Sequence, residues 1–224
     1  MVQIQGVEYN YYIIIFDVIF CMNKFRPYAA ELVGTSVLSF AVVLSVGSGQ
    51  QVLITPVVAA LTLGLFVYSM GHVSGCHLNP AVTIALSSLG KISGVQAVKY
   101  IVAQFAGVGL TLGMLLAIFE WSGEFSFVAP ESLGVFIAEA IGTAVFVFGV
   151  MAVVSGKVEK TMSGIVVGGS LLLGIFIAAS MGTEGILNPA VAVVLRSVSA
   201  SYIVGAIVGA LMGAWAYQAI CVDE

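Results

Sequence analysis

The chain of 224 residues is 60% hydrophobic and only 8% charged, with a formal net charge of −4. Because a soluble domain normally carries about 25% charged residues, this composition excludes an ordinary globular protein and predicts an integral membrane protein. The small negative charge gives no sign of a nucleic-acid partner. Cys21, Cys76 and Cys221 lie far apart without metal-ligand spacing, so we expect neither a bound metal nor a cofactor.

The first 27 residues differ in character from the rest of the chain. Tyr11–Phe20 is apolar apart from Asp17, but this segment is too short to cross a membrane. It also lacks the basic start and the small-residue cleavage site of a signal peptide. We therefore treat residues 1–27 as an N-terminal extension with two open interpretations. Either the start is wrongly assigned and Met22 is the true first residue, or the segment is an interfacial amphipathic helix.

Six later stretches are apolar and near the length of about 20 residues that a transmembrane helix needs. In chain order, the predicted spans are Tyr28–Val46, Val52–Met70, Val98–Phe119, Leu133–Val154, Met162–Ser180 and Tyr202–Cys221. Two further apolar stretches, Ala81–Leu89 and Ala190–Leu195, reach only about half a membrane and predict re-entrant half-helices. The predicted fold is an all-α membrane protein with six transmembrane helices and two re-entrant half-helices.

Glycines recur every four residues in two of these spans. The third span contains Gly109 and Gly113, and the sixth contains Gly205, Gly209 and Gly213. Small residues at this spacing allow the backbones of neighbouring helices to approach closely. We therefore expect both stripes to lie at helix–helix contacts.

The segment Leu-Asn-Pro-Ala-Val occurs twice, at Leu78–Val82 and at Leu187–Val191. Asn is a preferred helix N-cap and Pro suits the first helical position, so each triplet begins one half-helix. The residues concerned are Asn79, Pro80 and Ala81 in the first copy and Asn188, Pro189 and Ala190 in the second. We expect each Asn side-chain oxygen to cap its helix, leaving the amide NH2 free to hold the oxygen of water or a small polyol. The helix dipoles add positive partial charge at the same point, which disfavours cations.

The two triplets belong to an internal repeat. Ala30–Thr35 is echoed by Ala138–Thr143, and the triplets recur at nearly the same separation. We predict two units, residues 28–127 and 128–222, each with three spans and one half-helix. Because three is odd, the second unit is inverted in the membrane, and the half-helices meet near its midplane with their Asn caps side by side.

Glu31 and Glu139 occupy equivalent positions in the two units, inside predicted spans. A carboxylate within a membrane span is costly and indicates a functional or structural role. One interpretation is a proton relay. The other, which we favour, is that each carboxylate braces the irregular loop before a half-helix by accepting its backbone N–H groups.

Basic residues predict the orientation of the chain. With six spans, one side receives Lys24, Arg26, Lys91, Lys99, Lys157 and Lys160, whereas the other receives only Arg196. The basic side is assigned to the cytoplasm, together with both termini, and we expect the protein in the plasma membrane. On that side, His72, Cys76 and His77 precede the first half-helix and are expected to line the inner vestibule. Their spacing does not supply a four-ligand metal site.

These motifs resemble those of the aquaporin and glycerol-facilitator family, the major intrinsic proteins, over about residues 27–218. The resemblance rests on both Asn-Pro-Ala segments, on Ala30–Thr35 and Ala138–Thr143, and on the stretches Gly71–Thr83 and Tyr100–Phe105. It implies six tilted helices, two half-helices and one pore per subunit in a lipid-embedded homotetramer. It also implies a loop-bracing role for the two glutamates, and a channel rather than an enzyme.

One position departs from the family pattern. The family usually has Arg directly after the second triplet, whereas this chain has Val191, with Arg196 five residues later. The resemblance places the four outer-filter positions on Ala59, Phe176, Gly185 and Val191. We therefore predict a wider and less polar outer filter, which makes water, glycerol, urea, ammonia or dissolved gases plausible solutes.

The function predicted is a passive channel for water or small neutral solutes. One alternative is a proton- or ion-coupled carrier that uses Glu31 and Glu139. The other is a non-conducting membrane scaffold of the same fold, closed by Phe176 and Val191.

Overall fold

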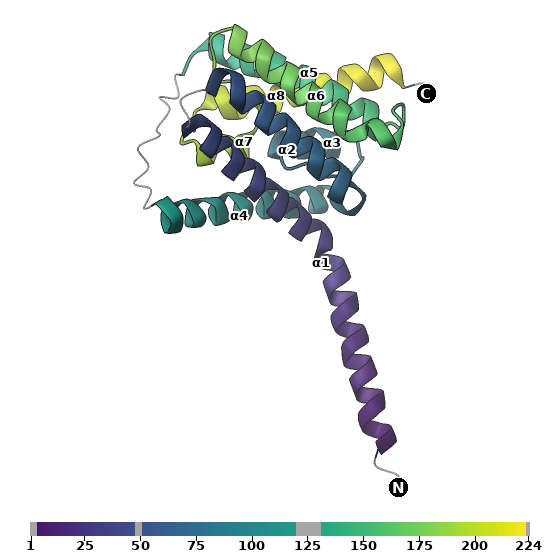
Figure 1. The fold of residues 1–224 in the computed structure, drawn as a ribbon. Helices are drawn as coiled ribbons and strands as arrows, with labels where there is room; N and C mark the ends of the chain where they lie inside the picture. The colour runs from purple at the N-terminus through teal and green to yellow at the C-terminus, as the bar shows by residue number, and fades with distance from the viewer. Residues whose placement is uncertain (1–3, 48–50, 120–130, 223–224) are drawn as a thin grey trace.

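The structure is a computed structural model that describes residues 4–47, 51–119 and 131–222, with side chains from residue 23 and without those of residues 51–53. The regular elements of these ranges are helices (Figure 1). They are α1 (Ile4–Gly47), α2 (Gln51–Ser74), α3 (Pro80–Ser88), α4 (Gly94–Phe119), α5 (Leu133–Val154), the short 3-10 helix η1 (Lys160–Met162), α6 (Ser163–Ser180), α7 (Pro189–Val194) and α8 (Ala200–Cys221). Among the described residues, six helices are long and apolar enough to cross a membrane. The predicted all-α membrane fold is confirmed.

Most predicted boundaries lie within four residues of the observed ones, and α5 matches its predicted span at both ends. The first span differs most, because α1 begins at Ile4 and contains Pro27, whereas the sequence predicted a start at Tyr28. Within α1, the candidate membrane span is Asn23–Gly47. The side chains on which the interpretations of Tyr11–Phe20 and Met22 depend lie outside the described residues.

The longer helices form two groups that meet along α2 and α6. In one group α1 packs on α2 and α4, and in the other α5 packs on α6 and α8. The short helices α3 and α7 lie among them, with α3 against α8 and α4, and α7 against α4 and α1 (Figure 1). This arrangement brings the first turns of the two short helices into the interior of the bundle.

Glycines set the close packing of α8 on α5. A Cβ added to Gly209 or Gly213 would collide with the backbone oxygens of Ala140 and Ala144, so these positions admit no side chain. The stripe of the third span makes no such contact within the chain, because a Cβ at Gly109 or Gly113 would meet nothing within 4 Å. Helical periodicity explains the difference, since these two glycines lie on the outward face of α4.

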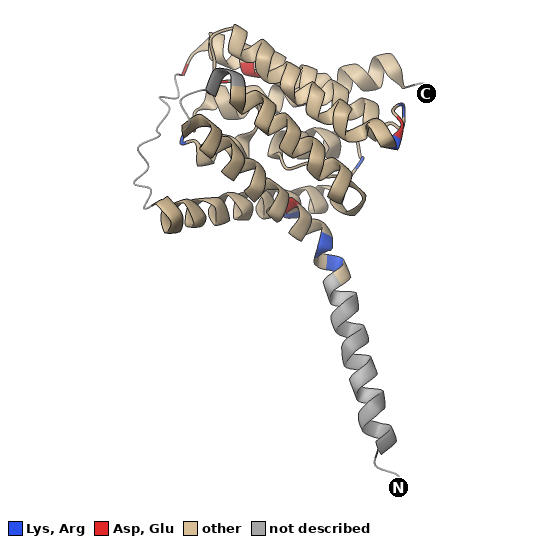
Figure 2. Ribbon diagram, viewed as in Figure 1, with Lys and Arg blue, Asp and Glu red and all other residues tan. Residues whose placement is uncertain are grey.

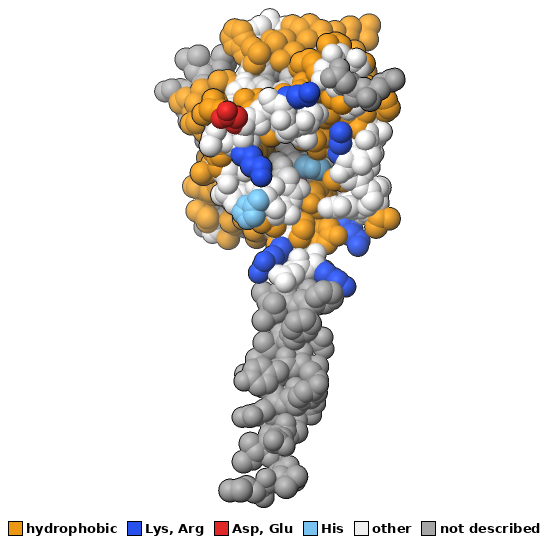
Figure 3. Space-filling model, turned by 90° about the vertical axis from the view of Figure 1, so that its right-hand side faces the viewer, with side chains coloured by type: hydrophobic (Ala, Val, Ile, Leu, Met, Phe, Trp, Pro, Cys, Tyr) orange, Lys and Arg blue, Asp and Glu red, His pale blue; other side chains and the backbone are white. Residues whose placement is uncertain are grey.

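Charged residues lie mainly at the two ends of the bundle (Figure 2). Chain topology places six basic residues at the same end. Lys24 and Arg26 lie in α1 at the start of its candidate membrane span Asn23–Gly47. Lys91 lies between α3 and α4, Lys99 lies near the start of α4, and Lys157 and Lys160 lie between α5 and α6. Figure 3 shows this end, where blue basic side chains and pale-blue histidines lie among hydrophobic side chains (orange) and other polar groups (white). Among the residues whose side chains are described, the two buried exceptions are Glu31 and Glu139, both with 0% exposure.

Candidate functional site

Both half-helices begin at an Asn cap. The backbone of Asn79 is extended, and its side-chain oxygen accepts the Ala81 N–H at 2.8 Å. In the second copy, the Asn188 side-chain oxygen accepts the Ala190 N–H at 3.0 Å. The following Pro residues occupy the first helical position, where the absence of an N–H costs no helical hydrogen bond. Each Asn-Pro-Ala triplet therefore fixes where its half-helix starts and points its N-terminus to the centre of the bundle.

The two caps are tied together by reciprocal hydrogen bonds. Asn79 Nδ2 donates to the Leu187 carbonyl oxygen at 2.8 Å, and Asn188 Nδ2 donates to the Leu78 carbonyl oxygen at 2.9 Å. Leu78 and Leu187 both have a left-handed backbone, with φ of 47° and 54°. For a residue other than glycine this backbone conformation costs about 1–3 kcal/mol. The cap bonds and the cross-links together hold this strained turn in place.

The sequence predicted that both N–H groups of each Asn amide would be free. This prediction is wrong for one N–H group at each cap, which donates to a leucine carbonyl. The reason is that the buried carbonyls of Leu78 and Leu187 need donors, and the opposite Asn supplies them. An Asn amide carries two N–H donors, so one remains at each cap. The remaining donors of Asn79 and Asn188 are the groups available to a solute oxygen at the centre.

The two buried glutamates contact the loops that lead into the half-helices. Glu31 accepts the backbone N–H groups of His77 at 2.9 Å and Leu78 at 2.8 Å. Its carboxylate also accepts the Ser74 hydroxyl and the Gln104 amide, at 2.7 and 2.8 Å. Four donors thus surround one carboxylate, which offsets the cost of burying its charge.

Glu139 makes the equivalent contacts in the second half of the chain. It accepts the backbone N–H groups of Ile186 at 3.1 Å and Leu187 at 2.8 Å, and the Thr183 hydroxyl at 3.1 Å. Both glutamates therefore bind the residue directly before the Asn cap and the residue before that one. This equivalence fits the predicted repeat, although the unit boundaries themselves stay a prediction.

A small cavity of about 70 Å³ lies beside the loop before α3, and we name it the inner cavity after the predicted orientation. Cys76 and His77 line it, together with apolar side chains from α2, α3, α5 and α6. His72 does not line it, because this residue is exposed in the last turn of α2. Two of the three predicted vestibule residues therefore reach the cavity.

Hydrogen bonds fix the tautomer of His77. The Thr83 hydroxyl donates to the Asn79 carbonyl oxygen at 3.0 Å and accepts the Gln104 amide at 2.9 Å. Since its hydrogen is already used, Thr83 accepts from His77 Nδ1 at 3.1 Å. His77 therefore carries its proton on Nδ1, and its Nε2 is left as an acceptor.

Gln104 and Thr83 are functional residues that sequence reasoning did not single out. Both have 0% exposure and link Glu31 to the start of α3. The available signal was an uncharged polar side chain, Gln104, inside a predicted membrane span, which needs a hydrogen-bond partner. Which partner it has could not be read from spacing, because the contact joins residues 73 positions apart.

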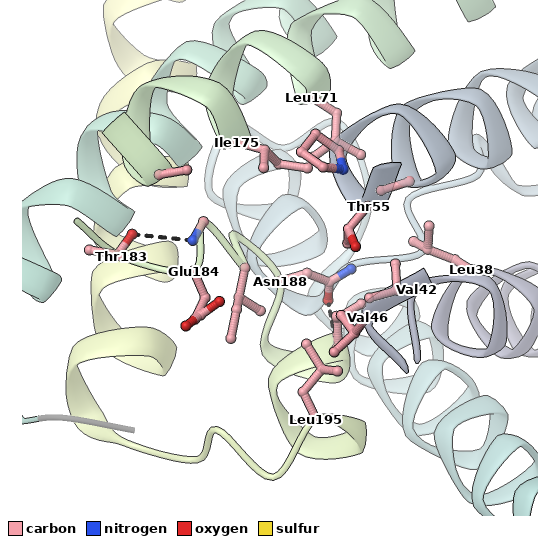
Figure 4. Close-up of a pocket in the computed structure, with 16 residues that line it drawn as sticks. Leu38, Val42, Val46, Thr55, Leu171, Ile175, Thr183, Glu184, Asn188 and Leu195 are labelled. Atoms are coloured by element: carbon pink, nitrogen blue, oxygen red, sulfur yellow. Dashed lines mark hydrogen bonds between the residues drawn. The ribbon is translucent and has the colours of Figure 1, made fainter. Parts of the chain in front are cut away.

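A larger cavity of about 290 Å³ lies on the other side of the Asn caps, and we name it the outer cavity. Figure 4 shows Asn188 among its lining residues, with Leu171 and Ile175 of α6 on one side and Val42 and Val46 of α1 on another. Because liquid water takes roughly 30 Å³ per molecule, a cavity of this size holds several waters or one small polyol. The lining is mostly apolar.

Three of the four predicted filter residues line the outer cavity, namely Ala59, Gly185 and Val191. Gly185 has a φ of 63°, and an added Cβ would lie 2.8 Å from the Ile175 carbonyl oxygen, so only glycine fits there. The fourth prediction, Phe176, is wrong. Phe176 is 65% exposed on the outer face of α6, and the preceding residue, Ile175, faces the cavity instead.

Helical rotation explains the error at Phe176. Leu171, Ile175 and Ala179 are four residues apart and line the cavity from one face of α6. Counting along the chain from the triplet across the loop 181–188 misplaced the position by one residue, which turns a side chain by about 100°. The non-conducting scaffold was predicted to be closed by Phe176 and Val191. Because Phe176 does not reach the outer cavity, only Val191 of this pair could close it.

The outer cavity also contains Glu184, which sequence reasoning did not consider. It is the one charged residue among the described residues that line this cavity, and its side chain is exposed at the rim. Partial burial raises the pKa of its carboxyl above the ordinary value. The signal in the sequence was a carboxylate four residues before an Asn cap, in an otherwise uncharged loop.

A helical membrane bundle with two opposed half-helices, whose caps meet between two cavities, defines a channel-type membrane protein. The sequence model of the major intrinsic protein family matches residues 20–217. Aquaporin NIP1-1 of Zea mays is 32% identical over 208 residues, covering 85% of this chain and 73% of the relative. Nodulin-26 of Glycine max is 34% identical over 207 residues, covering 85% and 76%. The chain belongs to the major intrinsic protein family.

A solved structure supports the same fold. The X-ray structure of the aquaglyceroporin from Plasmodium falciparum matches with a TM-score of 0.68 and 22% identity, covering 88% of this chain and 96% of that chain. The protein is therefore an integral membrane channel for water and small solutes and not an enzyme, which confirms the predicted class.

Proposed function

We propose that this channel has an apolar outer filter formed around Val191, and that it passes small neutral solutes as well as water. The observation that carries the proposal is the lining of the outer cavity, where Val191, Ala59 and Ile175 meet without a basic side chain among the described lining residues. A fixed positive charge at the position of Val191 would supply donors and reduce the width. Without it, the filter is wider and less polar, which favours a small polyol such as glycerol.

We further propose that flow is passive and that Glu31 and Glu139 brace the loops. Support comes from their hydrogen bonds, because both carboxylates accept several donors from residues that hold the half-helices. A proton relay needs a carboxylate that binds and releases protons during transport. Protonation of either glutamate would place an O–H against backbone donors, so the coupled carrier is disfavoured.

We propose a homotetramer in the plasma membrane with both termini in the cytoplasm. Large apolar side chains exposed on the helices, such as Val102 on α4 and Leu173 on α6, suit contact with lipid or a neighbouring subunit. The end that holds the basic side chains suits the cytoplasmic side (Figure 3). An accessibility assay on both termini in intact cells tests the orientation.

The proposed function is tested by stopped-flow light scattering of proteoliposomes exposed to gradients of water, glycerol and urea. We expect fast water and glycerol flux with a low activation energy and no dependence on an imposed pH gradient. Flux that requires the pH gradient would support the carrier instead. Absence of water and glycerol flux from intact assemblies would support the scaffold and overturn the proposal.

A further inference from the structure

Thr55 places a hydroxyl group in the wall of the outer cavity, on the face of α2 that also carries Ala59. The two residues are four positions apart, so Thr55 lies about one helical turn from this predicted filter position, towards the outer end of α2. Figure 4 shows Thr55 on a different side of the cavity from Thr183 and Glu184. A solute that moves from the outer side to the filter therefore passes this hydroxyl first.

A hydrogen bond from α1 holds this hydroxyl in place. The Ser45 side chain is buried, and its hydrogen is shared between the Val42 carbonyl oxygen at 2.7 Å and the Thr55 hydroxyl oxygen at 2.9 Å. Thr55 thus accepts from Ser45, and its own O–H has no acceptor among the described residues. Since a hydroxyl has one hydrogen and two acceptor sites, Thr55 keeps one donor and one acceptor site for a group inside the cavity.

The other polar side chains of the outer cavity offer no free hydroxyl at this level. The Thr183 hydroxyl donates to buried acceptors and accepts the Gly185 N–H. Glu184 is exposed at the rim, and Asn188 lies at the centre, where it caps α7. Between the rim and the centre, Thr55 is therefore the neutral side chain among the described lining residues that has an unused hydrogen-bond donor.

A hydroxyl beside an apolar filter matters most for a solute that itself has several hydroxyl groups. Glycerol gives up hydrogen bonds to water when it enters the filter, and the side chains of Ala59, Ile175 and Val191 cannot replace them. Thr55 replaces one of these bonds at the entrance, which lowers the free-energy barrier to entry. Water depends less on this group, because each water molecule keeps hydrogen bonds to the waters before and behind it.

We propose that Thr55 is a specificity-determining residue that binds a hydroxyl group of a polyol at the entrance to the apolar filter, and so raises the permeability of glycerol relative to water. This inference rests on the proposed channel function with its apolar filter. Thr55 is not one of the four filter positions that the family resemblance assigns. Its hydroxyl supplies a donor and an acceptor one turn outside the filter, without adding a charge or narrowing the filter itself.

The test is stopped-flow measurement of glycerol and water permeability in proteoliposomes that contain the wild-type protein, Thr55→Val, Thr55→Ser or Thr161→Val. Valine keeps the shape of threonine and removes the hydroxyl, whereas serine keeps the hydroxyl and removes a methyl group. Thr161→Val is the matched control, because it makes the same change at an exposed residue of η1 that lines neither the inner nor the outer cavity. Each permeability is divided by the amount of folded protein in the vesicles.

We expect Thr55→Val to lower glycerol permeability about fivefold and to keep water permeability, as the loss of one neutral hydrogen bond at the barrier allows. Thr55→Ser and Thr161→Val keep the wild-type ratio of glycerol to water. Glycerol permeability of Thr55→Val that equals or exceeds the wild-type value would overturn the inference. An equal fall in Thr55→Ser, or a fall of water and glycerol by the same factor, would also overturn it, because the hydroxyl would then not set the ratio. Wild-type vesicles that pass no glycerol would instead contradict the proposed function itself.

Discussion

The side-chain amide of Asn79 donates to the backbone carbonyl oxygen of Leu187 at 2.8 Å, although the two residues are 108 positions apart in the chain. Asn188 makes the same bond to Leu78 in the opposite direction. Each cap thus satisfies a carbonyl in the loop of the other half. The centre of the channel is held by contacts that both halves must supply, so damage to one cap affects both.

Replacing Asn79 by Asp tests this cross-link. An Asp oxygen still caps α3, but the donor to Leu187 is lost and two acceptors face each other. We expect the free energy of unfolding to fall by about 1–3 kcal/mol, as for other buried groups left unsatisfied. The added negative charge should also increase cation leak. Thermal unfolding in detergent and potassium flux in vesicles measure the two effects, and an unchanged stability would contradict the role of the cross-link.

Replacing Glu31 by Gln distinguishes bracing from proton relay. The carboxylate of Glu31 accepts from donors with both oxygens, whereas the side chain of Gln has only one oxygen. The NH2 group of the introduced Gln must therefore face a donor. We expect a loss of about 2–3 kcal/mol in stability, as for hydrogen bonds to a charged group, with reduced flux of every solute in proportion to folded protein. A fully stable variant that loses only pH-driven transport would show that Glu31 is a relay.

A pair of glycine substitutions tests the packing of the long helices. In Gly209→Ala the new Cβ collides with the Ala140 backbone on α5, so we expect destabilisation of about 1–3 kcal/mol. Gly109→Ala meets nothing within 4 Å in the chain and should be neutral or stabilising by about 0.5–1 kcal/mol, because alanine favours the helix. Thermal unfolding of the two variants measures the difference. Equal stability would mean that the α5–α8 contact is looser than described.

Cys76 provides a test of access to the inner cavity. Its thiol donates to the Phe66 carbonyl oxygen at 3.0 Å, and the residue lines the cavity beside His77. We expect mercuric ions to block solute flux through Cys76, and Cys76→Ser to remove the block. Cys221→Ser is the matched control, because this cysteine lies at the end of α8, outside the residues that line either cavity. Equal mercury sensitivity of Cys76→Ser and wild type would show that the block occurs elsewhere.

The sequence was sufficient for the helices because their signals are local. The length of the apolar stretches predicted the membrane spans. The Asn-Pro-Ala triplets predicted the first residues of α3 and α7 to within one residue. Contacts between distant residues were harder to predict. The binding of the Asn79 amide to Leu187 depends on how the loops turn, and no local pattern encodes that geometry.

The errors at Phe176 and His72 both concern which face of a helix a residue occupies, since His72 lies exposed in the last turn of α2. A helix position is defined by its rotation, and one residue of uncertainty in the loop after α6 moves a side chain from the cavity to the outer surface. Val191 was easier to place, because it follows the second Asn cap by three residues on a rigid helical turn. Glu184 lies in the irregular loop between α6 and α7, where no helical periodicity indicates which way a side chain points.

The central claim, an apolar filter at Val191, is tested most directly by the ratio of glycerol to water permeability in Val191→Arg. Val198→Arg is the matched control, because Val198 is 60% exposed and lies outside the outer cavity. We expect Val191→Arg to lower glycerol permeability about tenfold, a barrier increase of ~1.4 kcal/mol, while water still passes and Val198→Arg matches wild type. An unchanged glycerol-to-water ratio in folded Val191→Arg would contradict the claim.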